Sequence, residues 1–378
     1  MSKAAELAKI GEVATNGQIG GRRNIMYNGA MQVAQRSASV TGLGADGNTY
    51  NTLDRFQMLA NATAGRFTMS QTAITDLPGF ANCLKLDCTT ADASIAAGEY
   101  LIVGQNFEGQ DLQQIKKGTS DAEKLTVSFY VKGNANATYV FEILDADNNR
   151  QISKTFAVTT AWTRIIMTFP ADTTGAIDDD NAQSLRVFIW LHAGSTYASG
   201  TLNSSSWATS TAANRAVGGS SFFDATSRTF FITGYQLEVG SVATPFENRS
   251  FGEELDLCLR YYEKSSAYGV AEDSTAGANI YGVIGMAASA SAVGNNDAAM
   301  IHWQKPKRAT PTLVFYDSAG NSGKLSYAEA GVGRVDNIAT RSSNTGVNRS
   351  RIGTAGASSL DAGEAVEMLF QYTADSEL

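Results

Sequence analysis

The feature that most limits the fold of this chain is an alternation of apolar and polar residues with a period of two. Side chains on a β-strand point to opposite faces in turn, so this period predicts strands with one buried face. Turns rich in Gly, Asn and Asp separate the runs. Clear examples lie at 66–71, 125–132, 139–144, 163–169, 185–191 and 229–237. Strands at this spacing predict an antiparallel jelly-roll β-sandwich.

A second, smaller β domain is predicted after position 250. Residues 251–263 (FGEELDLCLRYYE) place their apolar side chains at helical spacing, and Ser250 with Glu253 matches a capping box. Beyond this linking helix, short strand-like stretches alternate with loops rich in Gly, Asn and Ser. The fold class is therefore mainly β, with helices confined to short segments.

The N-terminal region is predicted to be a separate segment. Residues 2–13 form a short amphipathic helix that includes Leu7 and Ile10, and a helix of this length needs a packing partner. Residues 37–50 are rich in Ser, Thr and Gly and are expected to form a loop. The expected domains are an N-terminal segment (1–50), a jelly-roll sandwich (51–250) and the linking helix with the distal β domain (251–378).

Composition excludes several classes of protein. The net charge of −8 over 378 residues would repel a phosphate backbone, which argues against a nucleic-acid partner. No apolar run approaches the roughly 20 residues that span a bilayer, so no membrane insertion is expected. Residues 1–14 lack the apolar core of a secretory signal. Synthesis in a cytoplasm without export by the standard route is therefore expected.

The sequence favours no catalytic centre, cofactor or metal. The two histidines, His192 and His302, lie in different predicted domains and are expected to be ordinary packed or surface residues, and no Gly-x-Ser-x-Gly motif occurs. The acidic segments 145–149 and 178–181 could bind Ca²⁺, but such residues also form ordinary turns, which we favour. A glycosidase with two carboxylates placed by the fold stays an alternative.

Several segments resemble bacteriophage tail-fibre and receptor-binding proteins of the marine phage type. ITGYQLEVG (232–240), ATPFENRS (243–250) and CLRYYEKS (258–265) are similar to the segment that closes a carbohydrate-binding-type jelly roll and enters the distal domain. Further similar segments are KPKRATPT (305–312), FQYTADSEL (370–378), MSKAAELA (1–8) and NIMYNGAMQVAQR (24–36). The resemblance covers both ends and the hinge, whereas 56–227 matches mostly in strand rhythm.

This resemblance implies a homotrimeric virion adhesin that attaches a phage to its bacterial host. The N-terminal segment would bind other virion proteins, and its attachment residues would be Leu7, Ile10, Arg22 and Arg23. The distal β domain would meet a glycan or protein of the host surface. Alternatives are a head fibre or capsid decoration protein without a receptor role, a capsule depolymerase, and a monomeric cellular carbohydrate-binding module.

Sugar binding would depend on aromatic rings that stack on the apolar faces of pyranoses, with amides and carboxylates bonding the hydroxyls. Trp207 lies in a polar loop with Tyr197 nearby, so the ring of Trp207 is either a ligand platform or part of a subunit interface. In the distal domain, Tyr316, Tyr327 and Asn321 are further candidate ligand-binding residues.

Overall fold

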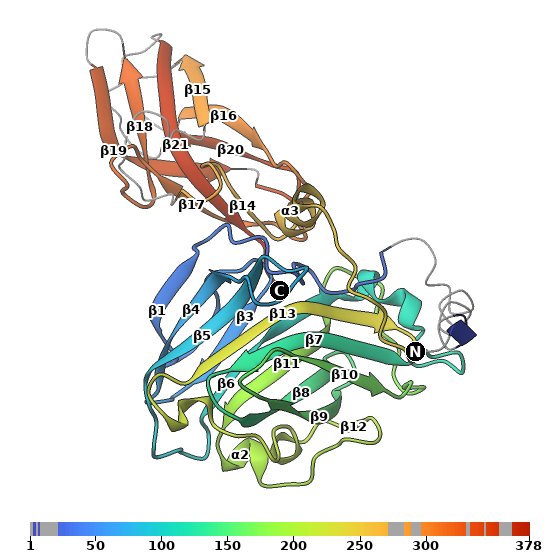
Figure 1. Cartoon of the computed structure of the whole chain (residues 1–378). Coiled ribbons are helices and arrows are strands. Elements are labelled where there is room, and N and C mark those ends of the chain that lie inside the picture. Colours follow the sequence, from blue (N-terminus) through green and yellow to red (C-terminus); the bar gives the residue numbers. More distant parts are fainter. Residues whose placement is uncertain are drawn as a thin grey trace. The chain divides into compact units, whose positions relative to one another are not determined.

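The computed structural model describes residues 3, 4, 7, 22–270, 283–288, 296–329, 333–343, 345–354 and 365–378. Antiparallel β-strands dominate it (Figure 1), which confirms the predicted fold class. The chain divides into two compact units. The first unit comprises Met1–Ala34, Ala38–Phe251 and Leu378, and the second comprises Gln35–Ser37 and Gly252–Glu377.

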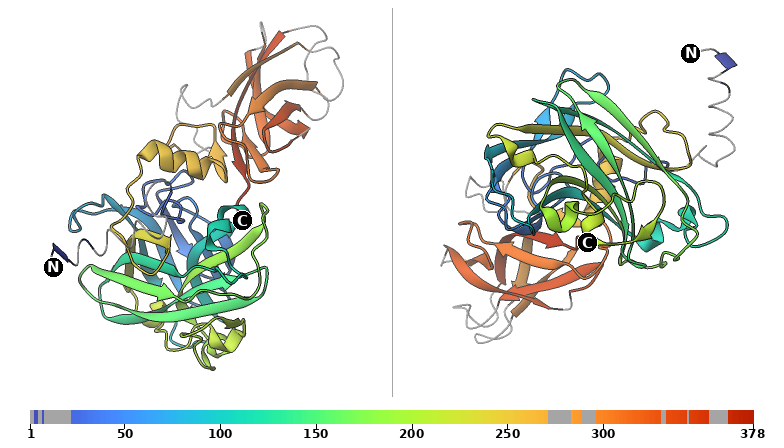
Figure 2. Two further views of the ribbon diagram at one scale, coloured as in Figure 1. Left: turned by 90° about the vertical axis from the view of Figure 1, so that its right-hand side faces the viewer. Right: turned by 90° about the horizontal axis from the view of Figure 1, so that it is seen from below.

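The first unit is a sandwich of two antiparallel sheets, which Figure 2 shows from two further directions. Sheet A has the strand order β1 (Ser39–Leu43), β4 (Arg66–Ala73), β5 (Asn82–Thr90), β13 (Thr229–Val239), β7 (Leu125–Gly133) and β10 (Thr163–Phe169). Sheet B has the order β12 (Ala208–Thr209), β9 (Arg150–Val158), β8 (Ala137–Asp145), β11 (Gln183–Ala193), β6 (Tyr100–Glu108), β3 (Gln57–Asn61) and β2 (Gly47–Tyr50).

Aromatic side chains from both sheets fill the space between them. The ring of Phe141 in β8 lies 5.9 Å from that of Phe129 in β7 and 6.3 Å from that of Tyr235 in β13. Tyr139 in β8 packs edge-on against Phe230 in β13 at 5.5 Å. Because β-strand side chains alternate, the intervening residues of β8 must point away from sheet A.

Two parts of the predicted N-terminal segment fold into the first unit. Residues 22–34 are mostly buried there, and the side chain of Asn24 donates to the carbonyl of Tyr235 at 3.0 Å. The loop expected at 37–50 instead contains β1 and β2. Both are edge strands with mainly exposed side chains, so they carry no alternating apolar pattern that the sequence could have shown. Of the predicted N-terminal helix, Lys3, Ala4 and Leu7 are helical, and the other positions lie outside the described residues.

Short helices connect the strands. They are η1 (Gly109–Asp111), η2 (Gln113–Ile115), α2 (Ser195–Ala198), η3 (Ala212–Asn214) and η4 (Phe222–Asp224). The predicted linking helix is α3, Phe251–Leu259. It ends before position 263 because the chain there enters a strand, in which Tyr262 pairs with Asp375.

The second unit is an antiparallel β structure built around its last strand. Its strands are β14 (Tyr262–Lys264), β15 (Val283–Ala288), β16 (Asn296–His302), β17 (Thr312–Tyr316), β18 (Lys324–Glu329), β19 (Gly333–Ser343), β20 (Arg349–Thr354) and β21 (Ala365–Asp375). Strand β21 pairs with β14, β15, β17 and β18. Phe315 and Phe370 meet edge-on in its core at 5.9 Å.

Gly104 in β6 leaves room for the ring of Phe188 in the neighbouring strand β11. A Cβ at this position would lie 2.1 Å from the carbonyl oxygen of Val187 and 2.6 Å from the ring of Phe188. We expect Gly104→Ala to lower the free energy of unfolding by about 1–3 kcal/mol, the usual cost of overpacking. Urea unfolding measures this change. Gly98→Ala is the control, because its nearest neighbour would be 3.9 Å away, and an equal loss in both variants would contradict the steric explanation.

Candidate functional site

Strand β11 places three large side chains on the surface of sheet B that faces away from sheet A. Its register sets Arg186 opposite Leu144, Phe188 opposite Glu142, and Trp190 opposite Val140. Directly paired residues share a face, and these residues of β8 point outward. We call the following set the sheet B face: Tyr100, Glu142, Arg186, Phe188, Trp190, Tyr197 and Arg215.

Three aromatic rings gather at one end of the sheet B face. Helix α2 brings the ring of Tyr197 to 5.3 Å from those of Tyr100 and Trp190. The rings of Tyr100 and Trp190 are 6.1 Å apart. Trp190 is buried and its Nε1 donates to Glu142 Oε2 at 2.9 Å, whereas both tyrosines are only half-buried. The exposed parts of the tyrosines can therefore contact a ligand while Trp190 supports them.

One of the two arginines on the sheet B face is neutralised by the protein itself. Arg215 donates two hydrogen bonds to Glu142, at 2.8 and 2.7 Å, and its guanidinium lies 4.8 Å from the centre of the Trp190 ring. Burial lowers the pKa of Arg215, but the carboxylate of Glu142 outweighs this effect and raises it. Two parallel hydrogen bonds between a guanidinium and a carboxylate hold both side chains in one geometry.

The other arginine, Arg186, has no such partner. Its guanidinium lies 5.9 Å from the centre of the Phe188 ring, and among the described residues it makes no hydrogen bond or ion pair. Its Nε is buried, and burial together with the positive charge of Arg215 lowers the pKa of Arg186. A buried donor without an acceptor costs about 1–3 kcal/mol. An anionic or oxygen-rich ligand on this face would supply the missing acceptor.

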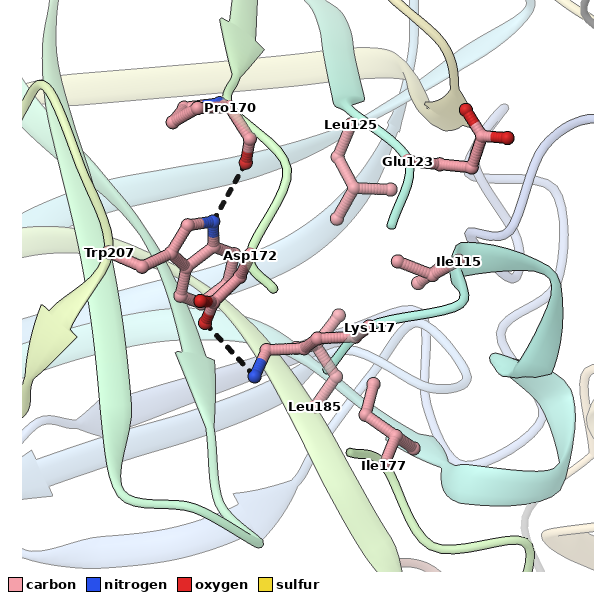
Figure 3. Close-up of a pocket in the computed structure, with 9 residues that line it drawn as sticks. All are labelled: Ile115, Lys117, Glu123, Leu125, Pro170, Asp172, Ile177, Leu185 and Trp207. Carbon is pink, nitrogen blue, oxygen red and sulfur yellow. Dashed lines mark hydrogen bonds and ion pairs between the residues drawn. The ribbon is translucent and has the colours of Figure 1, made fainter. Parts of the chain in front are cut away.

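Trp207, the first of the predicted ligand-binding residues, lies in a different cluster from Tyr197. Figure 3 shows its ring beside Lys117 and Asp172 at a small cavity of about 10 Å³. Its Nε1 donates to the carbonyl of Pro170 at 2.9 Å, and the Lys117 ammonium lies 5.5 Å from the ring centre. A cavity of this size is close to the minimum that one water molecule needs. A sugar ring therefore has no room inside it.

Lys117 is the centre of a buried ionic network beside this cavity. Its ammonium lies 2.5 Å from Asp145 Oδ2 and 3.0 Å from Asp172 Oδ2, and it also donates to the carbonyls of Thr174 and Gly175. Arg150 binds Asp172 through two bonds of 2.8 and 2.9 Å. Asp145 belongs to the first acidic segment considered for Ca²⁺, and in the structure its carboxylate forms an ion pair with the ammonium of Lys117.

The remaining predicted ligand residues belong to the second unit. Tyr316 is half-buried in β17, and Asn321 is exposed in a loop where its side chain donates to Asp317 at 2.8 Å. Tyr327 is 0% exposed and packs against Val335 and Ile338. Its ring is inside the core, so it presents no surface to a sugar.

The predicted attachment residues are placed as follows. Leu7 is 70% exposed, and Ile10 lies outside the described residues. Arg22 donates to the carbonyl of Ile25 at 3.2 Å and stacks over Tyr27 at 4.4 Å. Arg23 donates to the carbonyl of Pro245 at 3.3 Å. Arg23 thus connects this segment to the residues that follow β13, whereas these contacts of Arg22 lie within residues 22–27.

Sequence reasoning did not single out Arg186, Phe188, Glu142 or Arg215. A signal existed for the first two, because Arg186, Phe188 and Trp190 occur at every second position and must share one face of a strand. Arg215 and Glu142 are far apart in the sequence, and only the fold brings them together.

No protein-family profile matches the chain, and no curated protein has a matching sequence. Solved structures with a similar fold include a family 11 carbohydrate-binding module of a Clostridium thermocellum cellulase, which is 11% identical, with a TM-score of 0.27. The match covers 53% of this chain and 99% of that one. The N-terminal cellulose-binding domain of Cellulomonas fimi β-1,4-glucanase C is 10% identical, with a TM-score of 0.25, over 56% and 100% of the two chains. At these TM-scores the ligands of those modules say nothing about this chain.

Within the described residues, none of the helices combines the length and the apolar character that crossing a membrane requires.

Proposed function

We propose that this protein is a non-catalytic adhesin subunit of a bacteriophage fibre and that its first unit binds glycans on the sheet B face. The observation that carries the glycan-binding part is the arrangement around Arg186. Among the described residues, the guanidinium of Arg186 has no hydrogen-bond or ion-pair partner, and the half-buried rings of Tyr100 and Tyr197 lie on the same face of the sheet. Aromatic rings and planar hydrogen-bond donors are the two elements that recognise sugars.

The charges on this face favour an acidic sugar. Glu142 is occupied by Arg215, so the formal charge of Arg186 is left for a ligand. A guanidinium matches a carboxylate through two parallel hydrogen bonds, and a half-buried position strengthens them. Tyr100 lies six positions along β6 from Asn106, the residue opposite Arg186, which is about 20 Å at 3.3 Å per residue. In a polyuronate, the carboxylate of one sugar could therefore bind Arg186 while the apolar face of another contacts the tyrosines.

Binding of the full chain to alginate, a polyuronate, tests this proposal, with neutral dextran as the comparison. We expect Arg186→Met to weaken alginate binding by about 10- to 100-fold, the value of one or two hydrogen bonds between charged groups. Arg228→Met is the matched control, because it removes the same charge from an ion pair with Asp224 that does not belong to the sheet B face. Equal weakening in both variants, or alginate binding no stronger than dextran binding, would contradict the assignment of the sheet B face.

The virion part of the proposal is supported by the similar segments at both ends and at the hinge of the chain. It includes a homotrimer, attachment to other virion proteins through residues near the N-terminus, and recognition of the host surface. Light scattering should give about three times the chain mass of 40.0 kDa. A monomer would favour the alternative of a cellular carbohydrate-binding module.

A depolymerase alternative is tested in the same preparation. Asp92 and Glu99 are paired carboxylates, but they are 4% and 6% exposed, so a polysaccharide cannot reach them. We expect no new reducing ends when the protein is incubated with alginate or with bacterial capsule.

Cryo-microscopy of the virion distinguishes a tail fibre from a head fibre or decoration protein.

A further inference from the structure

Three buried side chains that the proposed glycan site does not use converge at one end of the first unit. They are Asp92 and Glu99, from the connection between β5 and β6, and His192, near the end of β11. One ligand atom from each lies within 4.8 Å of the others, and His192 Nε2 is 3.5 Å from Glu99 Oε2. Their exposed fractions are 4%, 6% and 1%.

The charges of this cluster do not balance. Each carboxylate accepts hydrogen bonds from backbone N–H groups: Asp92 from Ala64 and Ser94, and Glu99 from Ala96. In the described part of the chain no Lys or Arg pairs with either of them, and the imidazole of His192 lies beside Glu99. Two buried carboxylates beside one imidazole leave at least one negative charge uncompensated, which is costly in a protein interior.

The imidazole of His192 is oriented like that of a metal ligand. Its Nδ1 lies 2.8 Å from Ser221 Oγ, and its Nε2 is buried without a hydrogen-bond partner. When Nδ1–H donates to Ser221, the lone pair of Nε2 is free to coordinate a metal ion, and Glu99 Oε2 lies 3.5 Å from this nitrogen. A second partner on the other ring nitrogen is the usual way in which proteins fix a coordinating histidine.

The surrounding backbone holds the three groups in place. The N–H of Asp92 donates to the carbonyl of Phe223 at 2.8 Å, and the carbonyl of Glu99 accepts from Gly194 at 2.8 Å. The ring of Phe223 also packs against His192 at 5.3 Å. The connection between β5 and β6 is thereby tied to the end of β11 and to η4.

We propose that Asp92, Glu99 and His192 bind a divalent transition-metal ion, with Zn²⁺ as the best match. Zinc takes nitrogen from imidazole and oxygen from carboxylates at about 2.0–2.2 Å, which places ligand atoms about 3.4 Å apart in a tetrahedral site. The separation of 3.5 Å between Nε2 and Oε2 already fits this geometry. Imidazole is a poor ligand for Ca²⁺ and Mg²⁺, which prefer oxygen. The ion would supply the missing positive charge and fasten the connection between β5 and β6.

Nuclear magnetic resonance of the full chain with ¹⁵N-labelled histidine tests the site without altering it. The chain has two histidines, and His302 is exposed, so a His302→Gln variant assigns the signals. After removal of metals with a chelator, one equivalent of Zn²⁺ should shift Nε2 of His192 strongly and leave His302 unchanged. If the His192 nitrogens do not respond to Zn²⁺, the proposal is overturned.

Calorimetric titration with Zn²⁺ and Ca²⁺ provides the second measurement. We expect one Zn²⁺ per chain, a raised melting temperature, and affinity at least about 100-fold lower in Glu99→Gln, since removal of supporting groups alone costs 10- to 100-fold. His302→Gln should bind like the wild type. Preference for Ca²⁺ over Zn²⁺, or equal Zn²⁺ affinity in Glu99→Gln and the wild type, would overturn the assignment.

Discussion

Replacing Lys307 with Met is expected to destabilise the second unit by about 3–5 kcal/mol, because it leaves a buried carboxylate without its counter-charge. Lys307 and Glu263 are fully buried side chains whose charged atoms are 2.7 Å apart. Glu263 also accepts from the Tyr372 hydroxyl at 2.9 Å and from the Gln304 N–H at 3.0 Å. Burial lowers the pKa of Lys307, although Glu263 opposes this shift.

Hydrogen exchange of the β21 amides, followed by mass spectrometry, measures this loss in the second unit alone. The matched control is the double variant Lys307→Met with Glu263→Gln. It removes both charges and keeps an acceptor oxygen for Tyr372, so it should be more stable than the single variant. If the double variant loses as much stability as Lys307→Met and Glu263→Gln lose together, the charge pair is not the cause.

Replacing Lys117 with Met is expected to destabilise the first unit by a similar amount, about 3–5 kcal/mol at neutral pH. The change leaves Asp145 buried without a cation and removes one of the two cations at Asp172. The control variant is Lys116→Met, because Lys116 and Glu123 form an exposed ion pair that stabilises the fold by at most about 1 kcal/mol. Thermal unfolding of both variants should separate them clearly.

The effect of Lys117→Met should also depend on pH. Burial raises the pKa of Asp172, but bonds from Arg150 and Lys117 outweigh it and hold the pKa below the usual value of about 3.9. The wild type therefore has the full stabilisation above about pH 4 and loses it as the pH falls through the lower folded pKa. In the variant Asp172 keeps only Arg150 as a cationic partner, so less of this stabilisation is present to be lost, and the stability difference should shrink on acidification. A difference that grows at low pH would contradict this account.

The strands could be predicted from sequence because burial on one face imposes a period of two. The pattern at 125–132 and 229–237 therefore matches β7 and β13 closely. The pairing of β13 with β5 and β7 could not be predicted, since Ile232 meets Leu84 from about 150 positions earlier in the chain. Edge strands such as β2 could not be predicted because none of their side chains is buried, so burial imposes no pattern on them.

The candidate site was less predictable than the fold. The position of Trp207 in a polar loop predicts ligand contact, but no local pattern shows that its N–H donates to the carbonyl of Pro170. Tyr197 is a candidate because it lies near Trp207 in the sequence, and the fold places it beside Tyr100 on the sheet B face. Arg186 is important because no other described residue forms a hydrogen bond or ion pair with its guanidinium, and a sequence cannot show this.

The central position of β21 in the second unit also determines when that unit can form during synthesis. Four strands pair with β21, and they precede it by up to about 100 residues. These strands therefore leave the ribosome before β21 has been synthesised. Until then the edges that pair with β21 are unpaired, which favours aggregation. A chain that stops before Ala365 should accumulate as insoluble protein, whatever the strength of the contacts that precede it.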